Sequence, residues 1–257
     1  MLQAMKHWVG KKVRNMFGIT ELINYTSAIA THLDALAAHQ NRVKTDPYQI
    51  IMEKAAREAA DYIEKHPSSM VYPCMQRTGH LSFALSQAPS DGLFLEFGVC
   101  MGNSINHFAS QRQDTIFHGF DSFEGLPEDW LGHMSPKGTF SIGGTLPNVA
   151  KNVVLHKGWF DQTLPEFLAQ RKNEKIAFMH IDSDIYSSAK TILDCLGNHI
   201  IPGTVIVFDE YYYYNNWREH EYKAFAEFVK RANAEYRYIS FCEHSAAIII
   251  DNMGEGN

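Results

Sequence analysis

The chain has 257 residues, of which 45% are hydrophobic and 20% are charged, a composition typical of a globular protein. The net charge of −6 argues against a nucleic-acid partner, because such proteins carry strongly basic surfaces. No apolar run is long enough for a transmembrane segment, and lysines interrupt the N-terminal stretch where a signal peptide would be apolar. The four cysteines are far apart and form no C-x-x-C pair, so we expect reduced thiols and a cytoplasmic protein.

Amphipathic helices are predicted at the start of the chain. Apolar residues recur three and four positions apart over residues 1–17 and 19–39, and a third helical pattern covers residues 48–65. The first helix has a basic face, so contact with a membrane surface stays open, although packing against the chain or a second subunit is favoured. We predict a helical extension over residues 1–70 that contributes to a homo-oligomer interface, followed by a second domain over residues 71–257.

From Gly92 onward, apolar runs of strand length alternate with helical patterns. Such alternation indicates a mostly parallel sheet with helices on both faces, and the last two runs predict a hairpin. The predicted fold class is therefore α/β, a doubly wound, mostly parallel sheet of seven strands. The strands are expected at 92–97, 115–120, 152–156, 176–181, 203–208, 236–241 and 245–250, and the helices at 103–111, 163–172, 187–198 and 219–234.

The first of these strands leads into a glycine turn that suits a nucleoside ligand. The segment FLEFGVCMGNS places Glu96 at the strand end, followed by Gly98 and Gly102. Glycine has no Cβ, so a ligand can approach its backbone closely. Asp121 ends the next strand, and two acidic strand ends suit the hydroxyl groups of a ribose. The spacing is not the G-x-G-x-x-G of a dinucleotide site, which favours a ligand without pyrophosphate; an ordinary strand–helix turn is the alternative.

Carboxylate residues recur at the ends of the later strands. Asp182 follows the strand at 176–181, and Asp209 and Glu210 follow the strand at 203–208. In an open parallel sheet these ends meet at one edge, where ligands bind. Carboxylates gathered there repel one another unless a cation compensates them, and oxygen ligands suit Mg²⁺ or another divalent cation. The alternative is that Asp182 or Asp184 caps the following helix and that Asp209 starts a turn.

Two further segments are expected near the same edge. Residues 121–150 form a long irregular segment, and a loop of this length in a compact domain usually serves as a lid or a binding loop. Residues 211–221, with the sequence YYYYNNWREHE, place four tyrosines just beyond the acidic edge. These rings would stack on a carbohydrate or aromatic acceptor, or they would pack onto the N-terminal helices.

Taken together, five segments resemble the TylF/MycF family of macrocin-type sugar O-methyltransferases and, more distantly, the catechol and caffeoyl-CoA O-methyltransferases. They are LEFGVCMGNS, FDSFEGLPE, KGWFDQTLP, HIDSDIYSS and IVFDEYY, in the order of the family, and the resemblance covers roughly residues 70–250. It implies a Rossmann-like class I methyltransferase domain at 71–257. The implied cofactors are S-adenosyl-L-methionine (SAM) and Mg²⁺ or another divalent cation. The implied acceptor is a hydroxyl group of a sugar or of a glycosylated small molecule.

The resemblance also implies the catalytic and metal-binding residues. It makes Asp182, the first aspartate of the segment DSDIY, both a metal ligand and the general base. It makes Asp209 and Glu210 the other metal ligands. The family has Asp-Asp or Asp-Asn at this last pair, so Glu210 departs from the pattern.

The cofactor-binding residues follow from the same resemblance. Glu96 and Gly98 would line the methionine and ribose side, and Asp121 would hold the ribose hydroxyls. The ring of Trp159 or Phe160 would flank the adenine. Asn103 and Ser104 are either helix caps or cofactor contacts. The full implied set is Glu96, Gly98, Asn103, Ser104, Asp121, Ser122, Trp159, Phe160, Asp161 and Asp182.

Two other interpretations stay open. A nicotinamide-dependent oxidoreductase would share the fold class, but the missing dinucleotide fingerprint counts against it. A non-catalytic SAM-binding subunit would use the N-terminal helices to recruit a partner. The carboxylates at Asp182, Asp209 and Glu210 argue against a degenerate subunit.

Overall fold

The computed structural model describes residues 1–16 and 18–254, except the side chains of residues 16, 20, 23, 39–45 and 74. Residue 17 of the first predicted helix and residues 255–257 therefore lie outside the described residues. The chain divides into two compact units, Met1–Glu53 and Lys54–Asn257. Across the described residues, no helix is both long enough and apolar enough to cross a membrane.

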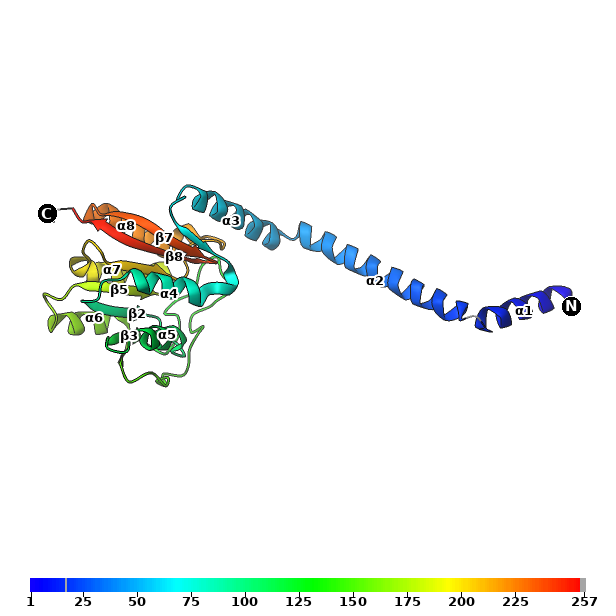
Figure 1. The fold of residues 1–257 in the computed structure, drawn as a ribbon, viewed down its shortest axis with the longest axis horizontal. Helices are drawn as coiled ribbons and strands as arrows, with labels where there is room; N and C mark the ends of the chain where they lie inside the picture. The colour runs from blue at the N-terminus through cyan, green and yellow to red at the C-terminus, as the bar shows by residue number, and fades with distance from the viewer. Residues whose placement is uncertain (17, 255–257) are drawn as a thin grey trace. The chain divides into compact units, whose positions relative to one another are not determined.

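The first unit is helical, as predicted. It contains α1 (Leu2–Met16), α2 (Ile19–Thr45) and the first part of α3 (Pro47–Glu64), drawn in blue in Figure 1. The helix α2 continues beyond its predicted end at residue 39. Large apolar side chains on α1 and α2 remain exposed, among them Trp8, Val9, Leu22, Tyr25, Ile29, Leu33 and Leu36.

The second unit is built on a sheet in the order β1-β7-β8-β6-β5-β2-β3-β4. All seven predicted strands are present, β8 pairs antiparallel with β6 and β7, and the neighbours from β6 to β4 are parallel. An eighth strand, β1, extends the edge parallel to β7, and its three residues before Pro73 are too few to show an alternating pattern. The strands are β1 (Met70–Tyr72), β2 (Leu93–Phe97), β3 (Phe117–Asp121), β4 (Val153–Lys157), β5 (Ile176–Ile181), β6 (Val205–Phe208), β7 (Glu235–Cys242) and β8 (Ser245–Asn252).

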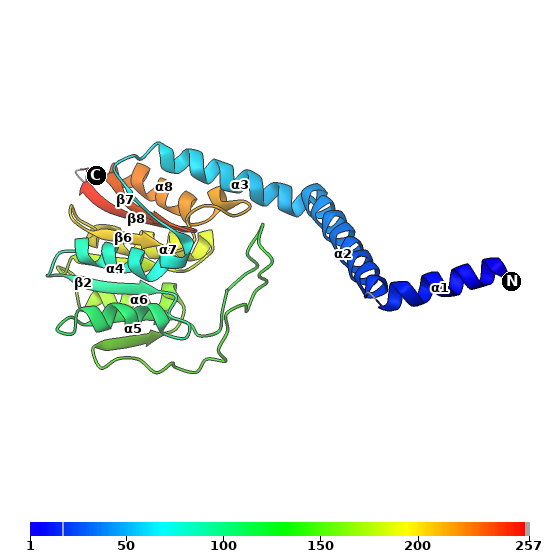
Figure 2. The same cartoon turned by 45° about the vertical axis from the view of Figure 1, so that its right-hand side comes forward.

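Helices cover both faces of this sheet (Figures 1 and 2). Successive side chains of a strand point to opposite faces, and ring contacts show which helix covers each. Phe178 of β5 packs on Phe108 of α5, in a cluster to which α4 also contributes, whereas Phe208 of β6 packs on Phe225 of α8 on the other face. The fold is therefore doubly wound. The helices are α4 (Arg77–Gln87), α5 (Asn103–Gln111), α6 (Phe160–Ala169), α7 (Tyr186–Leu196) and α8 (Glu221–Ala232), with short 3₁₀ turns η1 (Cys74–Gln76), η2 (Gly197–His199) and η3 (Trp217–Glu219).

In the second unit, two helices differ from the prediction by more than two residues. The helix α4 was not predicted, because Gly79 and several serine and threonine residues lower its helix propensity and interrupt its apolar stripe. Burial of Leu81 and Leu85 against the sheet stabilises it instead. The helix α6 begins at Phe160 rather than at residue 163, and the Thr163 hydroxyl inside it donates a hydrogen bond to the Trp159 carbonyl oxygen, 3.1 Å away.

A long segment leaves the sheet between β3 and β4. Residues 122–152 contain no helix or strand, as predicted for 121–150, and Figure 2 shows them in green as a loop that extends beyond the sheet. Backbone hydrogen bonds still fix its course: the Leu126 N–H donates to the Thr139 carbonyl at 3.0 Å and the Gly144 N–H donates to the Phe123 carbonyl at 2.8 Å. This loop lies at the edge where the carboxyl ends of the parallel strands meet.

Candidate functional site

A pocket of about 320 Å³ lies at the carboxyl ends of the parallel strands. Its walls come from the turns after β2, β3, β4 and β5, and the long loop adds Leu126 and Phe140. Glu96 and Asp161 do not line the pocket: Glu96 is buried behind it, 1% exposed. The lining does include these residues of the predicted cofactor set: Gly98, Asn103, Ser104, Asp121, Ser122, Trp159, Phe160 and Asp182.

The turn after β2 requires glycine at position 98. The φ angles of Gly98, Cys100 and Gly102 are +91°, +47° and +81°, so the chain enters the left-handed region repeatedly. A Cβ atom at Gly98 would lie 1.7 Å from the carbonyl oxygen of Asp182. The residue before helix α5 is Gly102, and no side chain caps that helix. Asn103 and Ser104 are therefore not caps but polar side chains of the pocket lining.

Asp121 holds this turn in place. Its Oδ2 accepts hydrogen bonds from the Val99 and Cys100 N–H groups at 2.9 and 2.7 Å, and its Oδ1 accepts one from the Phe123 N–H at 2.7 Å. A carboxylate has about four lone-pair sites, so roughly one stays available to a ligand. The sequence predicts that Asp121 binds ribose hydroxyls; within the chain it fixes the pocket wall.

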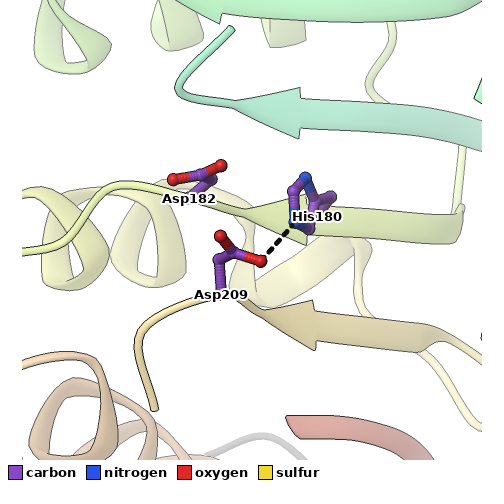
Figure 3. Close-up of side chains that lie close together, drawn as sticks. All are labelled: His180, Asp182 and Asp209. Atoms are coloured by element: carbon purple, nitrogen blue, oxygen red, sulfur yellow. Dashed lines mark ion pairs between the residues drawn. The ribbon is translucent and has the colours of Figure 1, made fainter. Parts of the chain in front are cut away.

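Beside the pocket, two carboxylates and an imidazole come together. One side-chain atom each of His180, Asp182 and Asp209 lies within 4.8 Å of the others, and Figure 3 shows them at the ends of β5 and β6. The Nδ1 of His180 lies 2.8 Å from Oε1 of buried Glu96, and its Nε2 lies 3.5 Å from Oδ1 of Asp209. His180 was not predicted, because a histidine inside an apolar strand is commonly a core residue.

Arg77, the first residue of α4, completes this group. Its Nε and Nη2 donate hydrogen bonds to Oδ1 and Oδ2 of Asp209, at 3.2 and 2.7 Å, and its Nη2 lies 3.6 Å from Oδ2 of Asp182. Negative and positive side chains thus alternate from the sheet interior to the pocket, in the order Glu96, His180, Asp209, Arg77, Asp182. The sequence showed the acidic residues but gave no signal for Arg77, since its helix was not predicted.

These contacts shift the pKa values of the group in opposite directions. Burial alone disfavours the charged imidazole, but hydrogen bonds and charges from Asp209 and Glu96 outweigh it and raise the pKa of His180 to about 10. Burial also disfavours the Asp209 carboxylate, yet His180 and Arg77 hold the pKa of Asp209 well below its usual range. Burial and the nearby charge of Asp209 raise the pKa of Asp182 well above its usual value. Of these two aspartates, Asp182 is thus the one suited to take up a proton.

Other acidic residues surround the cluster. Burial, followed by the charges of Asp209 and Asp121, raises the pKa of Asp184 to about 7, and its φ of +63° adds backbone strain of the kind found at functional sites. Glu210 lines the pocket, and burial and nearby carboxylates raise its pKa well above the usual value. It lies outside the group formed by His180, Asp182 and Asp209, so its role as third metal ligand stays a prediction.

Glu221, which the sequence did not single out, joins two of the strand-end loops. It is fully buried at the start of α8. Its Oε1 accepts from the Ser183 N–H and its Oε2 accepts from the Glu210 N–H, each at 3.2 Å. Burial and the charge of Asp184 raise the pKa of Glu221 to about 8. In the sequence, Glu221 is only an acidic residue near the start of a predicted helix. Acidic residues are common at such positions because they interact favourably with the helix dipole.

Two alternatives from the sequence are now decided. The helix α7 has Ile185 at its N-cap and no side-chain cap, so neither Asp182 nor Asp184 is a helix cap.

The expectation that the four tyrosines stack on an acceptor is wrong for three of them. Tyr211, Tyr212 and Tyr214 are at most 3% exposed, and the Tyr211 hydroxyl lies 2.7 Å from the Tyr238 hydroxyl inside the core.

Comparisons with known proteins agree with this geometry. The family model of a methyltransferase domain matches residues 95–211. Two structures of CalS11 are similar to the chain: a calicheamicin methyltransferase structure (23% identity, TM-score 0.58) and an apo structure described as a TDP-rhamnose 3'-O-methyltransferase (22%, 0.51). Each alignment covers 68% of this chain and 79% of CalS11. The O-methyltransferase NovP aligns over the same shares at 16% identity, with a TM-score of 0.48.

A search of curated protein sequences finds no match. The likeness to the CalS11 structures shows the fold, and the matched family model indicates the kind of domain that residues 95–211 resemble. The strand ends that build the pocket, from the turn after β2 to Glu210, all belong to the matched region. Residues 95–211 thus match the family model of a methyltransferase domain, and the sheet around them has the fold of the CalS11 structures.

Proposed function

We propose that this chain is a SAM-dependent O-methyltransferase whose acceptor is a hydroxyl group of a sugar or of a glycosylated small molecule. The observation that supports it is one pocket, inside the region matched by the methyltransferase domain, that is lined by both the Gly98 turn and Asp182. The CalS11 structure described as a TDP-rhamnose 3'-O-methyltransferase suggests the acceptor class by distant similarity.

The pocket residues suit the parts of this cofactor. The side chains of Trp159 and Phe160, at the start of α6, offer flat apolar surface for an adenine ring. The backbone of the Gly98 turn allows close approach of the methionine part. When bound, SAM supplies an electrophilic methyl group on a positively charged sulfur, and a lining rich in carboxylates favours that charge. Asp121 and Ser122 are placed for the ribose.

Asp182 is the proposed general base. It lines the pocket, and its raised pKa makes its carboxylate a stronger base toward the proton of an acceptor hydroxyl. With SAM bound, the acceptor oxygen would take up the methyl group that the cofactor supplies, S-adenosylhomocysteine would be the leaving group, and the proton would stay on Asp182. The loop residues Leu126 and Phe140 cover apolar wall of the same pocket and would help to exclude water.

The divalent cation expected at Asp182, Asp209 and Glu210 stays a prediction. Both oxygens of Asp209 accept hydrogen bonds from Arg77, whose Nη2 also lies 3.6 Å from Oδ2 of Asp182, so its positive charge lies beside both carboxylates. The side chains as they lie therefore do not fit a metal ion, and the proposed proton transfer needs none.

We also propose that the N-terminal helices over residues 1–70 form part of a homo-oligomer interface and that the protein is cytoplasmic.

Calorimetric titration tests the cofactor directly. We expect full-length protein to bind S-adenosylhomocysteine, the demethylated product, and not to bind NADH under the same conditions. Tight NADH binding with no response to S-adenosylhomocysteine would instead favour the oxidoreductase alternative. Binding of S-adenosylhomocysteine without turnover of any sugar hydroxyl would favour the non-catalytic subunit.

A further inference from the structure

Arg77 lies where a metal ion would have to bind. Its two hydrogen bonds to Asp209 use both oxygens of that carboxylate, and the same Nη2 reaches to within 3.6 Å of Asp182. A guanidinium group matches a carboxylate in this paired geometry and is weakly hydrated, so it is well suited to a partly buried site. Arg77 is therefore the positive charge that Asp182 and Asp209 share.

The fold holds Arg77 at this position. It is the first residue of α4, and Leu81 and Leu85 of that helix are 1% exposed in the main core. On the far side of Asp209, His180 is fixed by its hydrogen bond to Glu96. Asp209 is thus held between the guanidinium of Arg77 and the imidazole of His180, each anchored to a buried element. A divalent ion that took an oxygen ligand from Asp209 would lie next to the positive charge of Arg77, which repels it.

We infer that Arg77 is the resident cation of the Asp182–Asp209 pair, and that it competes with divalent metal ions for these two carboxylates. This inference deepens the proposed function, because it identifies the group that neutralises Asp209 beside the proposed base. Arg77 acts as a positioning residue: it draws Asp182 and Asp209 toward one guanidinium and holds both at the pocket.

Binding of Mn²⁺ to metal-stripped, full-length protein tests this, with free Mn²⁺ followed by electron paramagnetic resonance. We expect Arg77→Gln to bind Mn²⁺ at least about ten-fold more tightly than the wild type, because a positive charge next to the site is removed. Adding Asp209→Asn to Arg77→Gln should abolish that gain. The matched control is Arg231→Gln, which removes an arginine paired with Asp194 at 2.8 Å on the surface and should leave Mn²⁺ affinity unchanged.

Asp209→Asn in the wild-type background gives a second measurement that does not depend on folding of Arg77→Gln. We expect it to leave Mn²⁺ affinity within about two-fold of the wild type, because Arg77 already occupies the oxygens of Asp209. The inference is overturned if the wild type binds Mn²⁺ tightly and Asp209→Asn weakens that binding, or if folded Arg77→Gln gains no affinity. Titration with S-adenosylhomocysteine tests the proposed function separately. Absence of binding in that titration would count against the proposed function and not against the competition between Arg77 and divalent metal ions.

Discussion

Gly98 and Asp182 lie in contact through their backbones: a Cβ atom at Gly98 would be 1.7 Å from the Asp182 carbonyl oxygen. The Asp182 N–H donates a hydrogen bond to the Phe97 carbonyl at 2.8 Å, and the Gly98 N–H donates to the Phe120 carbonyl at 3.0 Å. The turn that is proposed to face the cofactor and the loop that carries the proposed base are therefore one rigid unit. The position of either depends on the other.

Substitution Gly98→Ala should disrupt both parts at once. The new methyl group would clash with the carbonyl oxygen of Asp182, and that backbone cannot move without disrupting the pairing of β2 with β5. We therefore expect the free energy of unfolding to fall by at least about 3 kcal/mol. Urea denaturation measures it, and S-adenosylhomocysteine binding should fall below detection. Gly138→Ala is the control: its φ is +83° but no atom lies within 4 Å of the added Cβ, so only about 1–2 kcal/mol of backbone strain is expected. Equal losses in the two variants would contradict the steric argument.

Substitution Asp121→Ala should weaken cofactor binding by roughly 1–3 kcal/mol, the range of a hydrogen bond to a charged group. Three backbone N–H groups of the pocket wall also lose their acceptor, so the free energy of unfolding should fall as well. Calorimetry and urea denaturation separate the two effects. Asp129→Ala removes a carboxylate that accepts the Lys137 N–H outside the pocket and should leave S-adenosylhomocysteine affinity unchanged.

Much of this arrangement could be predicted from the sequence, because strand periodicity and strand-end residues are local signals. The seven strands, their hairpin and the edge that carries Asp121, Asp182 and Asp209 follow from them. Arg77 could not be predicted, since α4 forms through burial of its apolar side chains against distant strands rather than through its own propensity. The burial of Tyr211 likewise depends on Tyr238, a contact with no local signal.

Oligomerisation can be tested on the exposed apolar face of α2. Ile29 and Leu33 are 59% and 60% exposed, one helical turn apart, and burial of such side chains in an interface is favourable by roughly 1–2 kcal/mol each. We expect the double substitution Ile29→Ser and Leu33→Ser to lower the mass measured by light scattering at micromolar concentration. Ser27→Ala, at another exposed position of α2, should not change that mass. An unchanged mass in the double variant would show that this face is not an interface.

His118 of β3 should contribute a loss of stability in acid. Burial lowers the pKa of His118 to about 4, and the nearby His156 adds to the shift, so the folded state takes up a proton less readily than the unfolded state. The unfolded state gains a proton below about pH 6.5, and stability is therefore lost as the pH falls from 6.5 toward 4. His118→Phe keeps the ring against Phe167 but cannot titrate. Urea denaturation at pH 7 and pH 5 gives the change in unfolding free energy between the two pH values; we expect this change to be more favourable to the folded state in the variant than in the wild type, and an equal change would exclude His118 as a cause.

The strongest test of the chemistry compares three isosteric substitutions. Asp182→Asn removes the proposed base while keeping the shape of the side chain, so we expect the turnover number to fall by about 10²–10⁴-fold. Asp209→Asn should cost less, because it weakens the contacts of Arg77 and His180 but leaves the base in place. Asp184→Asn should cost least, since asparagine tolerates the φ of +63° at that position.

Binding of S-adenosylhomocysteine is the control for all three substitutions, because the Gly98 turn and the residues around Trp159 are not altered. We expect Asp182→Asn to bind it within a few-fold of the wild type. A loss of turnover with retained binding places the effect on the chemical step rather than on the assembly of the pocket. If Asp182→Asn is as active as the wild type, proton removal by Asp182 is wrong. The base would then be sought elsewhere, and His220 is a poor candidate: burial lowers its pKa, and its Nε2 lies 2.8 Å from the Leu131 carbonyl oxygen, away from the lining of the pocket.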